Sequence, residues 1–593
     1  MGNSLLSVRD INHKYIVVGG YGVMSYLSNE ILISLLKQYG IKKLVLSSGS
    51  RNIPFVSAVE VDKAFECFSV IDERNASFFG LGLSQQFNEP VAIVCTSGTA
   101  ASNYLTGVTE AFYSNVPLVV ITFDRSPYML NQLETQKIDQ SAIFVSVCKK
   151  SVTLPIIKDD DDAWYCQRLI NEALIALNQH ETGPVHINVP LLGDQNALVD
   201  ASITYSKTDD VNKIEYIPID DEETWLLMAD KLNNSNRVLV IMGQTTNIDG
   251  KMKEVLDNFF DSYQCPLLTD HLSNYCCEQV ISAEAVIKAL NAKTVVSMLP
   301  DIVITFGCNF QERIKDIFKA NRGKFEHWSI EPNGVVKDVF KSQSALFECK
   351  PYVFFEKMVA FKGDYSANSI LYLSSWQRLK DAIVLPEMSF TNFYAIGEFA
   401  NVIPQNSILH LSILNSTRIM QFYELDKSIK VYSNVNAFGI DGCLPTFLGQ
   451  AYGAEELAFL VIGDLSFFYG MNALAIKHRK RNIRILVINN GGGAEFHIMP
   501  DSNAIPTIDL HIGAAHDTKV QGWAESMDYE YFSAYDKESL DEVLKSFVSK
   551  DHENPVLLEV FTNMKEDGEQ ILSVYRYVES CIKPLVSEAE ERK

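Results

Sequence analysis

The sequence predicts an α/β protein of three domains, each built on a mostly parallel β-sheet flanked by helices. Short apolar runs rich in Val, Ile and Leu alternate with longer segments of helical period along the whole chain. At 593 residues the chain is too long for one hydrophobic core, since domains hold roughly 150 residues. Two polar stretches, residues 196–223 and 362–369, interrupt the alternation. They divide the chain into domains at about 1–195, 215–365 and 375–593.

The apolar runs are expected to form strands that are buried on both faces, because they lack the polar alternation of half-exposed strands. Each is followed by Gly, Ser, Asp or Asn, and ligands of open parallel sheets bind beyond the carboxyl ends of the strands. The runs are KLVLSSGS (43–50), PVAIVCTSGT (90–99), PLVVITFDR (117–125), RVLVIMGQ (237–244), DIVITFGCN (301–309), LAFLVIGD (457–464) and IRILVINN (483–490).

Charge, hydropathy and cysteine content indicate which kinds of partner and which cellular compartment to expect. The formal net charge of −23 would repel a nucleic-acid backbone, and no segregated basic stripe offsets it. The first residues lack a secretion signal, and no apolar run reaches the roughly 20 residues of a membrane helix. Eleven scattered cysteines without a CxxC pair are typical of free thiols in a reducing compartment. We therefore expect a cytoplasmic protein that binds neither nucleic acid nor membrane.

Two motifs at the ends of the last two strands point to a metal and diphosphate site. Gly463 and Asp464 end one strand, and Asn489 and Asn490 end the next, 490 − 464 = 26 residues later. One helix and a return strand fit this spacing, so both side chains should meet at one sheet edge. Carboxylate, amide and backbone carbonyl oxygens suit Mg²⁺, and a helix starting near Ser466 would direct N–H groups at phosphates. Each dipeptide alone is also a common turn former.

Together, the two motifs resemble the fingerprint of thiamine-diphosphate enzymes. Such enzymes need a second carboxylate that drives the aminopyrimidine ring of the cofactor to its imino form. Glu73, which lies between the strand-like SVI (69–71) and the apolar helix SFFGLGL (77–83), is our candidate. The alternative for Glu73 is a solvated acid at a helix start.

Further motifs lie in the first and last thirds of the chain: SSGSRNIPF (47–55), DERNASFFGLGL (72–83), CTSGTAASN (95–103), ITFDRSP (121–127), TQKIDQ (135–140), GPVHINVP (183–190) and SNVNAFGIDG (433–442). With these the chain resembles the SEPHCHC synthase family, thiamine-diphosphate enzymes of menaquinone biosynthesis that add a succinyl unit from 2-oxoglutarate to isochorismate. The resemblance implies the three-domain thiamine-diphosphate-binding fold, with a pyrimidine-binding, a central and a diphosphate-binding domain.

The resemblance also implies roles for individual residues. Glu73 matches the cofactor-activating acid and Ile440 the apolar residue that props the cofactor into its bent shape. The metal ligands match Asp464, Asn490 and the carbonyl of Gly492, and the cofactor-binding turn comprises Gly463, Asp464, Leu465 and Ser466. The polar residues that face the substrates match Ser50, Arg51, Arg125 and Gln136, of which Gln136 would orient a proton or a carbonyl group. The family supplies Glu73 and the metal site from different subunits, which implies a homodimer or homotetramer.

The two arginines are credible anion binders from the residues alone. Arg51 and Arg125 each follow a predicted strand, and a guanidinium offers two parallel donors to a carboxylate. The alternative is an arginine paired with Asp124 or with the loop backbone.

Basic residues of the family are missing from the donor side. The family has arginines where this chain has Val435 and Met420, and the central basic pair is half kept as Arg313 followed by Ile314. Arg418, on the segment that begins with Asn415 and Ser416, is the candidate replacement, although its side chain leaves the backbone two residues earlier. The apolar residues Val435, Phe438 and Met420 would suit a donor without a second carboxylate, such as pyruvate. Arg313, Ser416 and Arg418 are therefore candidate substrate-binding residues.

Four functions remain open from the sequence. The leading one is decarboxylation of pyruvate or 2-oxoglutarate with transfer of the acyl carbanion to an acceptor. The alternatives are the SEPHCHC synthase reaction itself, simple decarboxylation to an aldehyde, and an inactive assembly or regulatory subunit. The cationic acceptor side argues against simple decarboxylation, and the intact Glu73, Asp464 and Asn490 argue against an inactive subunit.

Overall fold

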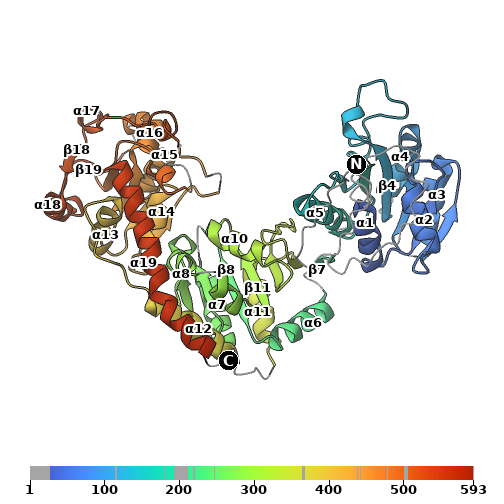
Figure 1. Ribbon diagram of the computed structural model, residues 1–593, viewed down its shortest axis with the longest axis horizontal. Helices are drawn as coiled ribbons and strands as arrows, with labels where there is room; N and C mark the ends of the chain where they lie inside the picture. The colour runs from blue at the N-terminus through green and yellow to red at the C-terminus, as the bar shows by residue number, and fades with distance from the viewer. Residues whose placement is uncertain are drawn as a thin grey trace, which may run out of the picture. The chain divides into compact units, whose positions relative to one another are not determined.

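A computed structural model describes residues 27–87, 89–113, 116–179, 182–191, 211–217, 221–245, 248–290, 292–363, 368–436, 438–440, 442–476, 479–499 and 505–591. Three mostly parallel β-sheets with flanking helices follow one another along this part of the chain (Figure 1). The predicted α/β class with three sheets is confirmed. No helix in the described ranges is long and apolar enough to cross a bilayer.

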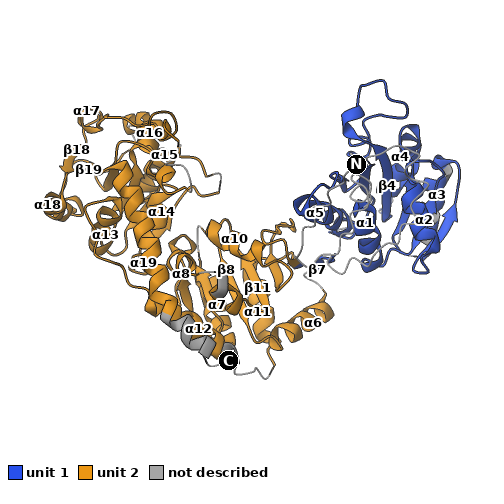
Figure 2. Ribbon diagram, in the orientation of Figure 1, with its two compact units in different colours: residues 1–218, 344–346 blue, residues 219–343, 347–593 orange. Residues whose placement is uncertain are grey.

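Two compact units divide the chain (Figure 2). Unit 1 comprises residues 1–218 and 344–346, and unit 2 comprises residues 219–343 and 347–593. Unit 1 contains the first sheet, and unit 2 contains the last sheet and most of the central one. The polar stretches expected between domains, 196–223 and 362–369, lie partly outside the described residues, so the three predicted domain limits stay a prediction.

The first sheet has six parallel strands in the order β2-β1-β3-β4-β6-β5. The strands are β1 (Lys43–Leu46), β2 (Glu66–Ser69), β3 (Val91–Cys95), β4 (Leu118–Arg125), β5 (Lys150–Thr153) and β6 (Val185–Leu191). The helical segments are α1 (Leu27–Gln38), α2 (Ile53–Val61), α3 (Glu73–Phe87), α4 (Thr99–Tyr113), the 3-10 turn η2 (Pro127–Met129) and α5 (Asp160–Ala176).

Both faces of this sheet are buried. Successive residues of β3 alternate between two hydrophobic clusters, with Ala92 and Val94 in one and Ile93 and Cys95 in the other. This alternation explains why the strand is a continuous apolar run, since a strand covered by helices on both faces has no polar side.

The central sheet has seven strands in the order β10-β9-β8-β11-β12-β13-β7. They are β7 (Glu215–Ile217), β8 (Val238–Met242), β9 (Leu267–Thr269), β10 (Val280–Ser282), β11 (Ile302–Phe306), β12 (Glu326–Ile330) and β13 (Gln343–Phe347). Its helical segments are α6 (Glu222–Asn233), α7 (Gly250–Tyr263), η4 (His271–Ser273), α8 (Ala283–Ala289), α9 (Ala292–Ser297), α10 (Glu312–Ala320) and α11 (Pro351–Ala360). Asp249 caps α7, because its carboxylate accepts a hydrogen bond from the Met252 N–H at 2.8 Å.

The last sheet has six parallel strands in the order β15-β14-β16-β17-β19-β18. They are β14 (Ile408–Leu411), β15 (Lys430–Tyr432), β16 (Ala458–Gly463), β17 (Ile483–Asn489), β18 (Glu530–Ala534) and β19 (Val556–Phe561). Helices are α12 (Asn368–Ala382), α13 (Asn392–Val402), α14 (Asn415–Met420), α15 (Cys443–Gly453), α16 (Asp464–Gly470), α17 (Gln521–Ser526), α18 (Lys537–Phe547) and α19 (Met564–Glu591). Shorter turns are η5 (Met471–Ala475), η6 (Ala494–His497) and the π-helical η8 (Ile508–Ile512).

The first and last sheets share one topology. When the strands of each are numbered in chain order, both read 2-1-3-4-6-5. Loops that follow corresponding strands therefore occupy corresponding positions at the carboxyl edges of the two sheets.

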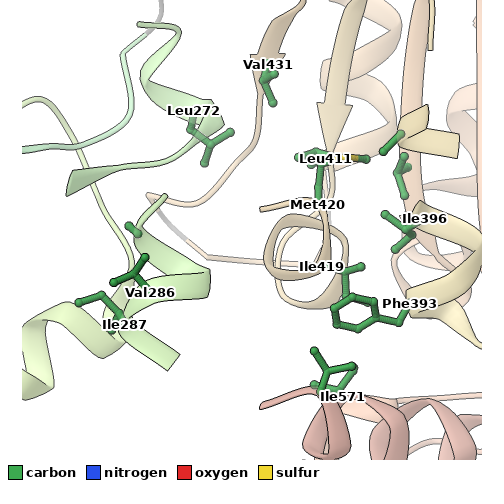
Figure 3. Packing of buried hydrophobic residues seen from close by; sticks show 14 of the residues in the cluster. Leu272, Val286, Ile287, Phe393, Ile396, Leu411, Ile419, Met420, Val431 and Ile571 are labelled. Carbon is green, nitrogen blue, oxygen red and sulfur yellow. The ribbon is translucent and has the colours of Figure 1, made fainter. Parts of the chain in front are cut away.

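One hydrophobic cluster joins the central and last sheets within unit 2. It includes Val286 and Ile287 of α8 as well as residues of α13, β14 and α14. Figure 3 shows Ile419 of α14 pointing toward Phe393 of α13. This packing fixes the short helix α14 at the carboxyl edge of the last sheet.

Candidate functional site

Asp464 lies at the centre of a group of polar atoms in unit 2. β16 ends at Gly463, and α16 begins at Asp464, which is 2 % exposed. Its Oδ2 accepts hydrogen bonds from the backbone N–H groups of Asn490 at 3.1 Å, Gly491 at 2.8 Å and Gly492 at 3.1 Å. The two motifs meet at one edge because β16 and β17 are neighbouring parallel strands.

The amide of Asn490 has a bonded nitrogen and an oxygen without a donor. Its Nδ2 donates to Oδ2 of Asp567 at 2.8 Å. Its Oδ1 is buried and has no hydrogen-bond partner within the described residues. A buried oxygen in this state is costly, because it has lost its bond to water. The atom therefore fits a hard cation such as Mg²⁺, which would replace the missing donor.

Asp567 fixes the orientation of that amide. Its buried carboxylate also accepts from the backbone N–H of Asn392 and from Oγ1 of Thr562, at 2.8 and 2.7 Å. Burial raises the pKa of Asp567 to about 6. Because three donors hold this carboxylate, the Asn490 nitrogen faces Asp567 and the oxygen faces away from it.

The glycines after Asn490 allow the loop to close on Asp464. Gly491 and Gly492 have φ angles of +79° and +150°. A Cβ at Gly492 would lie 2.7 Å from the Gly513 carbonyl oxygen and 2.9 Å from Sδ of Met564. Only glycine fits this position without a shift of its neighbours. The Asp464 carboxylate, the Asn490 amide and the Gly492 carbonyl are thus three hard oxygen donors carried by Asp464 and one adjacent loop.

The other predicted cofactor-binding residues surround the start of α16. Leu465 donates its backbone N–H to Oδ1 of Asp464 at 2.6 Å. Ser466 donates its hydroxyl to the carbonyl of Ile440, which joins the loop after β15 to this helix. Ile440 is half-buried and packs against the large hydrophobic cluster of unit 2. The residues predicted from both motifs are therefore connected through direct bonds.

His516 is a neighbour of Asp464 that sequence reasoning missed. Its Nε2 lies 3.3 Å from Oδ2 of Asp464, and this contact raises the pKa of His516. Asp567 was missed as well. Neither residue belongs to a motif or follows a predicted strand directly, so only the folded chain reveals them.

Glu73 stands in unit 1, in the first turn of α3, and is half-buried. Burial raises the pKa of Cys95 and Tyr104, and the Glu73 charge adds to this effect. The Tyr104 hydroxyl in turn lies 3.2 Å from Oγ of Ser47. Glu73 is therefore close to a buried, uncharged layer of the first sheet. The metal-ligand candidates belong to unit 2.

Arg125 is held by its own loop in unit 1. Its NH1 lies 2.5 Å from Oε1 of Glu134, and its NH2 donates to Oγ1 of Thr135 at 3.2 Å. Asp124 forms a separate ion pair with Lys137 at 2.6 Å, and these two side chains are only 4 % and 5 % exposed. The arginine side chain thus pairs with Glu134 and not with its neighbour Asp124.

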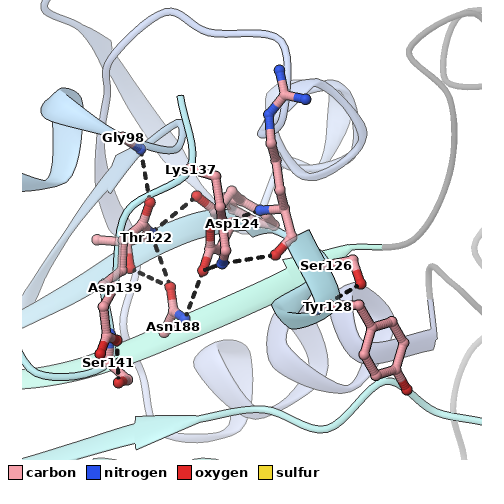
Figure 4. A network of polar contacts seen from close by, with 12 residues as sticks. Gly98, Thr122, Asp124, Ser126, Tyr128, Lys137, Asp139, Ser141 and Asn188 are labelled. Atoms are coloured by element: carbon pink, nitrogen blue, oxygen red, sulfur yellow. Dashed lines mark hydrogen bonds and ion pairs between the residues drawn. The ribbon is translucent and has the colours of Figure 1, made fainter. Parts of the chain in front are cut away.

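A buried network continues from Asp124 across the sheet edge. Figure 4 shows Asn188 of β6 between Thr122 and Asp124 of β4. Gln140 donates to Oδ1 of Asn188 at 3.0 Å and accepts from the Gly98 N–H at 2.7 Å. The network anchors the segment of residues 134–140.

Gln136 lies on that anchored segment. It is exposed and has a φ angle of +53°. Its backbone packs closely on Gly98, where a Cβ would lie 3.2 Å from Cα of Gln136. The geometry presents the Gln136 side chain outward from the carboxyl edge of the first sheet.

Ser50 and Arg51 lie in the loop after β1. Arg51 is 7 % exposed, and its backbone N–H donates to Oγ1 of Thr96 at 3.2 Å. This bond links the loops after β1 and β3, which are neighbouring strands. The predicted residues of unit 1 therefore all lie in loops, at a strand end or at a helix start at the carboxyl edge of the first sheet: Ser50, Arg51, Glu73, Arg125 and Gln136.

The residues predicted to bind the 2-oxo acid donor have different surroundings. Arg313 is exposed on α10, whereas Ile314 is buried. Oγ of Ser416 lies 3.0 Å from Oγ of Ser412. NH1 of Arg418 lies 2.5 Å from Oε2 of Glu495, an acid that sequence reasoning did not single out.

The apolar residues Met420, Val435 and Phe438 differ in how far they are buried. Met420 is fully buried and Val435 almost so, and both pack into the hydrophobic cluster of unit 2. Phe438 alone is exposed, with a φ angle of +58°. The reason is that an apolar side chain gains free energy by entering the core, where a guanidinium would have to reach outward.

Comparison with known proteins identifies the family. Residues 28–143 match the family described as thiamine pyrophosphate enzyme, N-terminal TPP binding domain. A 2-succinyl-5-enolpyruvyl-6-hydroxy-3-cyclohexene-1-carboxylate synthase of Bacteroides fragilis is 36 % identical over 557 residues, which cover 93 % of this chain and 98 % of the relative.

Two further relatives carry the same name. The protein of Bacteroides thetaiotaomicron is 34 % identical, over 92 % of this chain and 97 % of the relative. The protein of Flavobacterium johnsoniae is 30 % identical, over 90 % of this chain and 95 % of the relative. The chain therefore belongs to the 2-succinyl-5-enolpyruvyl-6-hydroxy-3-cyclohexene-1-carboxylate synthase family and is a thiamine-diphosphate-dependent enzyme that forms a carbon–carbon bond.

Proposed function

We propose that this enzyme uses thiamine diphosphate and Mg²⁺ to decarboxylate 2-oxoglutarate and to join the remaining succinyl unit to isochorismate. The observation that carries the proposal is the match to the B. fragilis synthase over nearly the whole of both chains. The printed name of that relative describes a product with a succinyl group on a cyclohexene carboxylate. Loss of CO₂ from 2-oxoglutarate leaves a succinyl unit, so the donor follows from the product.

Mg²⁺ is supported by the oxygen donors in unit 2. Asp464 would hold the cation through its carboxylate, Asn490 through its unpartnered Oδ1 and Gly492 through its carbonyl. Phosphate oxygens of the cofactor would complete the coordination. When bound, thiamine diphosphate supplies the electron sink that the departure of CO₂ requires.

The residues of unit 1 would handle the proton and the acceptor. Glu73 would share a proton with the pyrimidine ring of the cofactor and so promote its imino form. Arg51 and Arg125 would bind carboxylates of the acceptor, for which Arg125 would exchange its contact with Glu134. Ser50 and Gln136 would orient the acceptor by hydrogen bonds.

A site shared between subunits would unite the two groups, as the family resemblance implies, and would make the enzyme at least a homodimer. Complementation tests this arrangement. Glu73→Gln and Asp464→Asn are each expected to be inactive, whereas refolding or coexpressing them together should restore part of the activity, because one mixed site then carries both native residues. Failure of the mixture to recover activity would argue for sites built within one subunit.

A second candidate is a donor without a distal carboxylate, such as pyruvate. It is favoured by the contact of Arg418 with Glu495 and by the burial of Met420 and Val435 in the core. In that case the family chemistry is retained and only the acyl group differs.

The experiment that separates these candidates is CO₂ release by the purified protein with thiamine diphosphate and Mg²⁺. Pyruvate and 2-oxoglutarate are offered separately, with and without isochorismate, and Glu73→Gln serves as the blank. Release from 2-oxoglutarate that rises with isochorismate supports the proposal. Release from pyruvate alone supports the second candidate, and an aldehyde product without acceptor would indicate simple decarboxylation. Full activity of Glu73→Gln would refute the role of Glu73.

A further inference from the structure

Arg418 and Glu495 approach each other beside the candidate metal loop. α14, which carries Arg418, follows β14, and η6, which carries Glu495, follows the loop after β17. Glu495 is three residues beyond Gly492 in the sequence. Both charged residues therefore lie at the carboxyl edge of the last sheet, where the ligands of such sheets bind.

The pair is close and only partly accessible. NH1 of Arg418 is 2.5 Å from Oε2 of Glu495, with 24 % and 15 % of the two side chains exposed. This is the single hydrogen bond that the guanidinium makes to the described residues. A guanidinium has five N–H donors in a planar fork, so Arg418 can still offer donors to a second carboxylate.

A second carboxylate, that of Glu284, also favours the protonated form of Arg418. Glu284 is fully buried, accepts from Nε2 of Gln311 and lies 3.8 Å from Nζ of Lys288. Burial would lower the pKa of Arg418, but the ion pair with Glu495 and, beyond it, Tyr575 and Glu284 hold it above its usual value. Arg418 is therefore a permanent cation whose partner in the free protein is a carboxylate of the chain itself.

We propose that Glu495 competes with the distal carboxylate of the donor for Arg418 and so sets the preference between dicarboxylic and monocarboxylic 2-oxo acids. The inference rests on the proposed function, because it concerns the donor of that reaction. A dicarboxylic donor must displace or share the bond between Glu495 and Arg418, whereas a donor such as pyruvate leaves the pair intact. The carboxylate of Glu495 thus takes the place that a donor carboxylate would occupy on the guanidinium.

The test measures kcat/KM for 2-oxoglutarate and for pyruvate in the wild type, Glu495→Gln and Arg418→Gln. Glutamine at 495 keeps the shape of the side chain but removes its charge. We expect the preference for 2-oxoglutarate over pyruvate to rise about tenfold in Glu495→Gln, the size of one charge-assisted hydrogen bond. It should fall by a similar factor in Arg418→Gln, with pyruvate little affected.

Glu455→Gln is the matched control, because it breaks an ion pair of similar length, 2.7 Å to Lys480, at an exposed position. It should leave the donor preference unchanged. If Glu495→Gln lowers the melting temperature but changes kcat/KM for both donors equally, the pair is only structural and the proposal is overturned.

A binding measurement separates this inference from the proposed reaction. Calorimetry with the holoenzyme uses glutarate and propionate, unreactive counterparts of the two donors. Tighter binding of glutarate relative to propionate in Glu495→Gln supports the selectivity role even where no CO₂ is released. Turnover of 2-oxoglutarate with an unchanged binding ratio would uphold the reaction and refute the role of Glu495.

Discussion

The first and last sheets have the same strand order, 2-1-3-4-6-5, but their carboxyl edges are finished differently. After β4, the Asp124 carboxylate is saturated by Lys137, by the Arg125 N–H and by Asn188. After the corresponding strand β17, Asn490 keeps a buried oxygen without a donor in the described chain. Topology places polar residues at an edge of the sheet. The local partners then decide whether the hydrogen bonds and ligand contacts of these residues come from the protein or from a bound ligand.

The two edges differ because their loops supply different hydrogen-bond donors. At the first edge, side chains of residues 137 and 140 return to the strand ends and satisfy the buried groups. At the last edge, Gly491 and Gly492 supply only backbone N–H groups; both donate to Asp464, and that of Gly491 also donates to Oδ1 of Asn489. The first edge is therefore satisfied by side chains of its own loop, whereas at the last edge the Asn490 Oδ1 has no donor among the described residues.

The largest expected effect comes from Asp464→Asn, which removes the negative charge from this position at the carboxyl edge of the last sheet. Loss of a metal-binding carboxylate should cost several kcal/mol, a fall in activity of about a thousandfold or more. CO₂ release and calorimetric binding of thiamine diphosphate with Mg²⁺ measure it. Asp528→Asn is the control, because that carboxylate is 83 % exposed in its pair with Arg479. Equal cofactor affinity in wild type and Asp464→Asn would contradict the assignment.

The corresponding change at the carboxyl edge of the first sheet, Asp124→Asn, should lower the free energy of unfolding. It leaves the buried Lys137 ammonium without its carboxylate, which typically costs about 3–5 kcal/mol. Denaturant unfolding of the protein measures the loss. Asp62→Asn breaks the more exposed pair with Lys37 and should cost under about 1 kcal/mol. If both variants lose the same free energy, the Asp124 network does not anchor residues 134–140.

Asp567→Asn tests whether the metal site proposed at the carboxyl edge of the last sheet depends on the orientation of the Asn490 amide. The change leaves a single acceptor oxygen for the three donors that bond to Asp567, so the Asn490 Nδ2 has to compete for it and the amide is held less firmly. Partners that orient metal ligands typically contribute a factor of about 10–100 in metal affinity. Titration of the protein with Mg²⁺ at fixed thiamine diphosphate gives the change. An unaltered Mg²⁺ requirement would show that Asn490 is not a ligand.

The last expected effect depends on pH and concerns two buried histidines, one on a described strand of each of these two sheets. Burial lowers the pKa of His186 on β6 from 6.5 to about 3 and that of His410 on β14 from 6.5 to about 4. A depressed pKa contributes stability above pH 6.5 that is lost as the pH falls toward the folded value. The loss is at most about 1.4 kcal/mol per pH unit for each histidine.

Unfolding free energies between pH 6.5 and 4 check this expectation for wild type, His186→Gln and His410→Gln. Each variant should show a shallower dependence than the wild type. His186 accepts or donates at both ring nitrogens, to Thr122 and Ser151, whereas His410 has one partner, Gln450. Parallel curves for wild type and His186→Gln would mean that this histidine is not protonated on unfolding.

The sequence predicted the elements whose signals are local. Continuous apolar runs such as that of β3 indicated strands buried on both faces, and helices cover both faces. The spacing of Asp464 and Asn490 indicated that they meet, because neighbouring parallel strands end at one edge. In contrast, the burial of Met420 and Val435 in the hydrophobic cluster could not be predicted from the sequence, since packing against distant residues decides it.

What the sequence determined by itself is therefore the α/β class, the edge at which Asp464 and Asn490 meet and the family, since these depend on periodicity, spacing and motifs along the chain. Only the tertiary structure showed that Arg418 contacts Glu495, that Asp567 orients Asn490 and that Glu134 pairs with Arg125. The first two contacts join residues that are far apart in the sequence, and the third joins residues nine positions apart in one loop. No pattern in the sequence carries that information, because it depends on how the folded loops and helix ends approach one another.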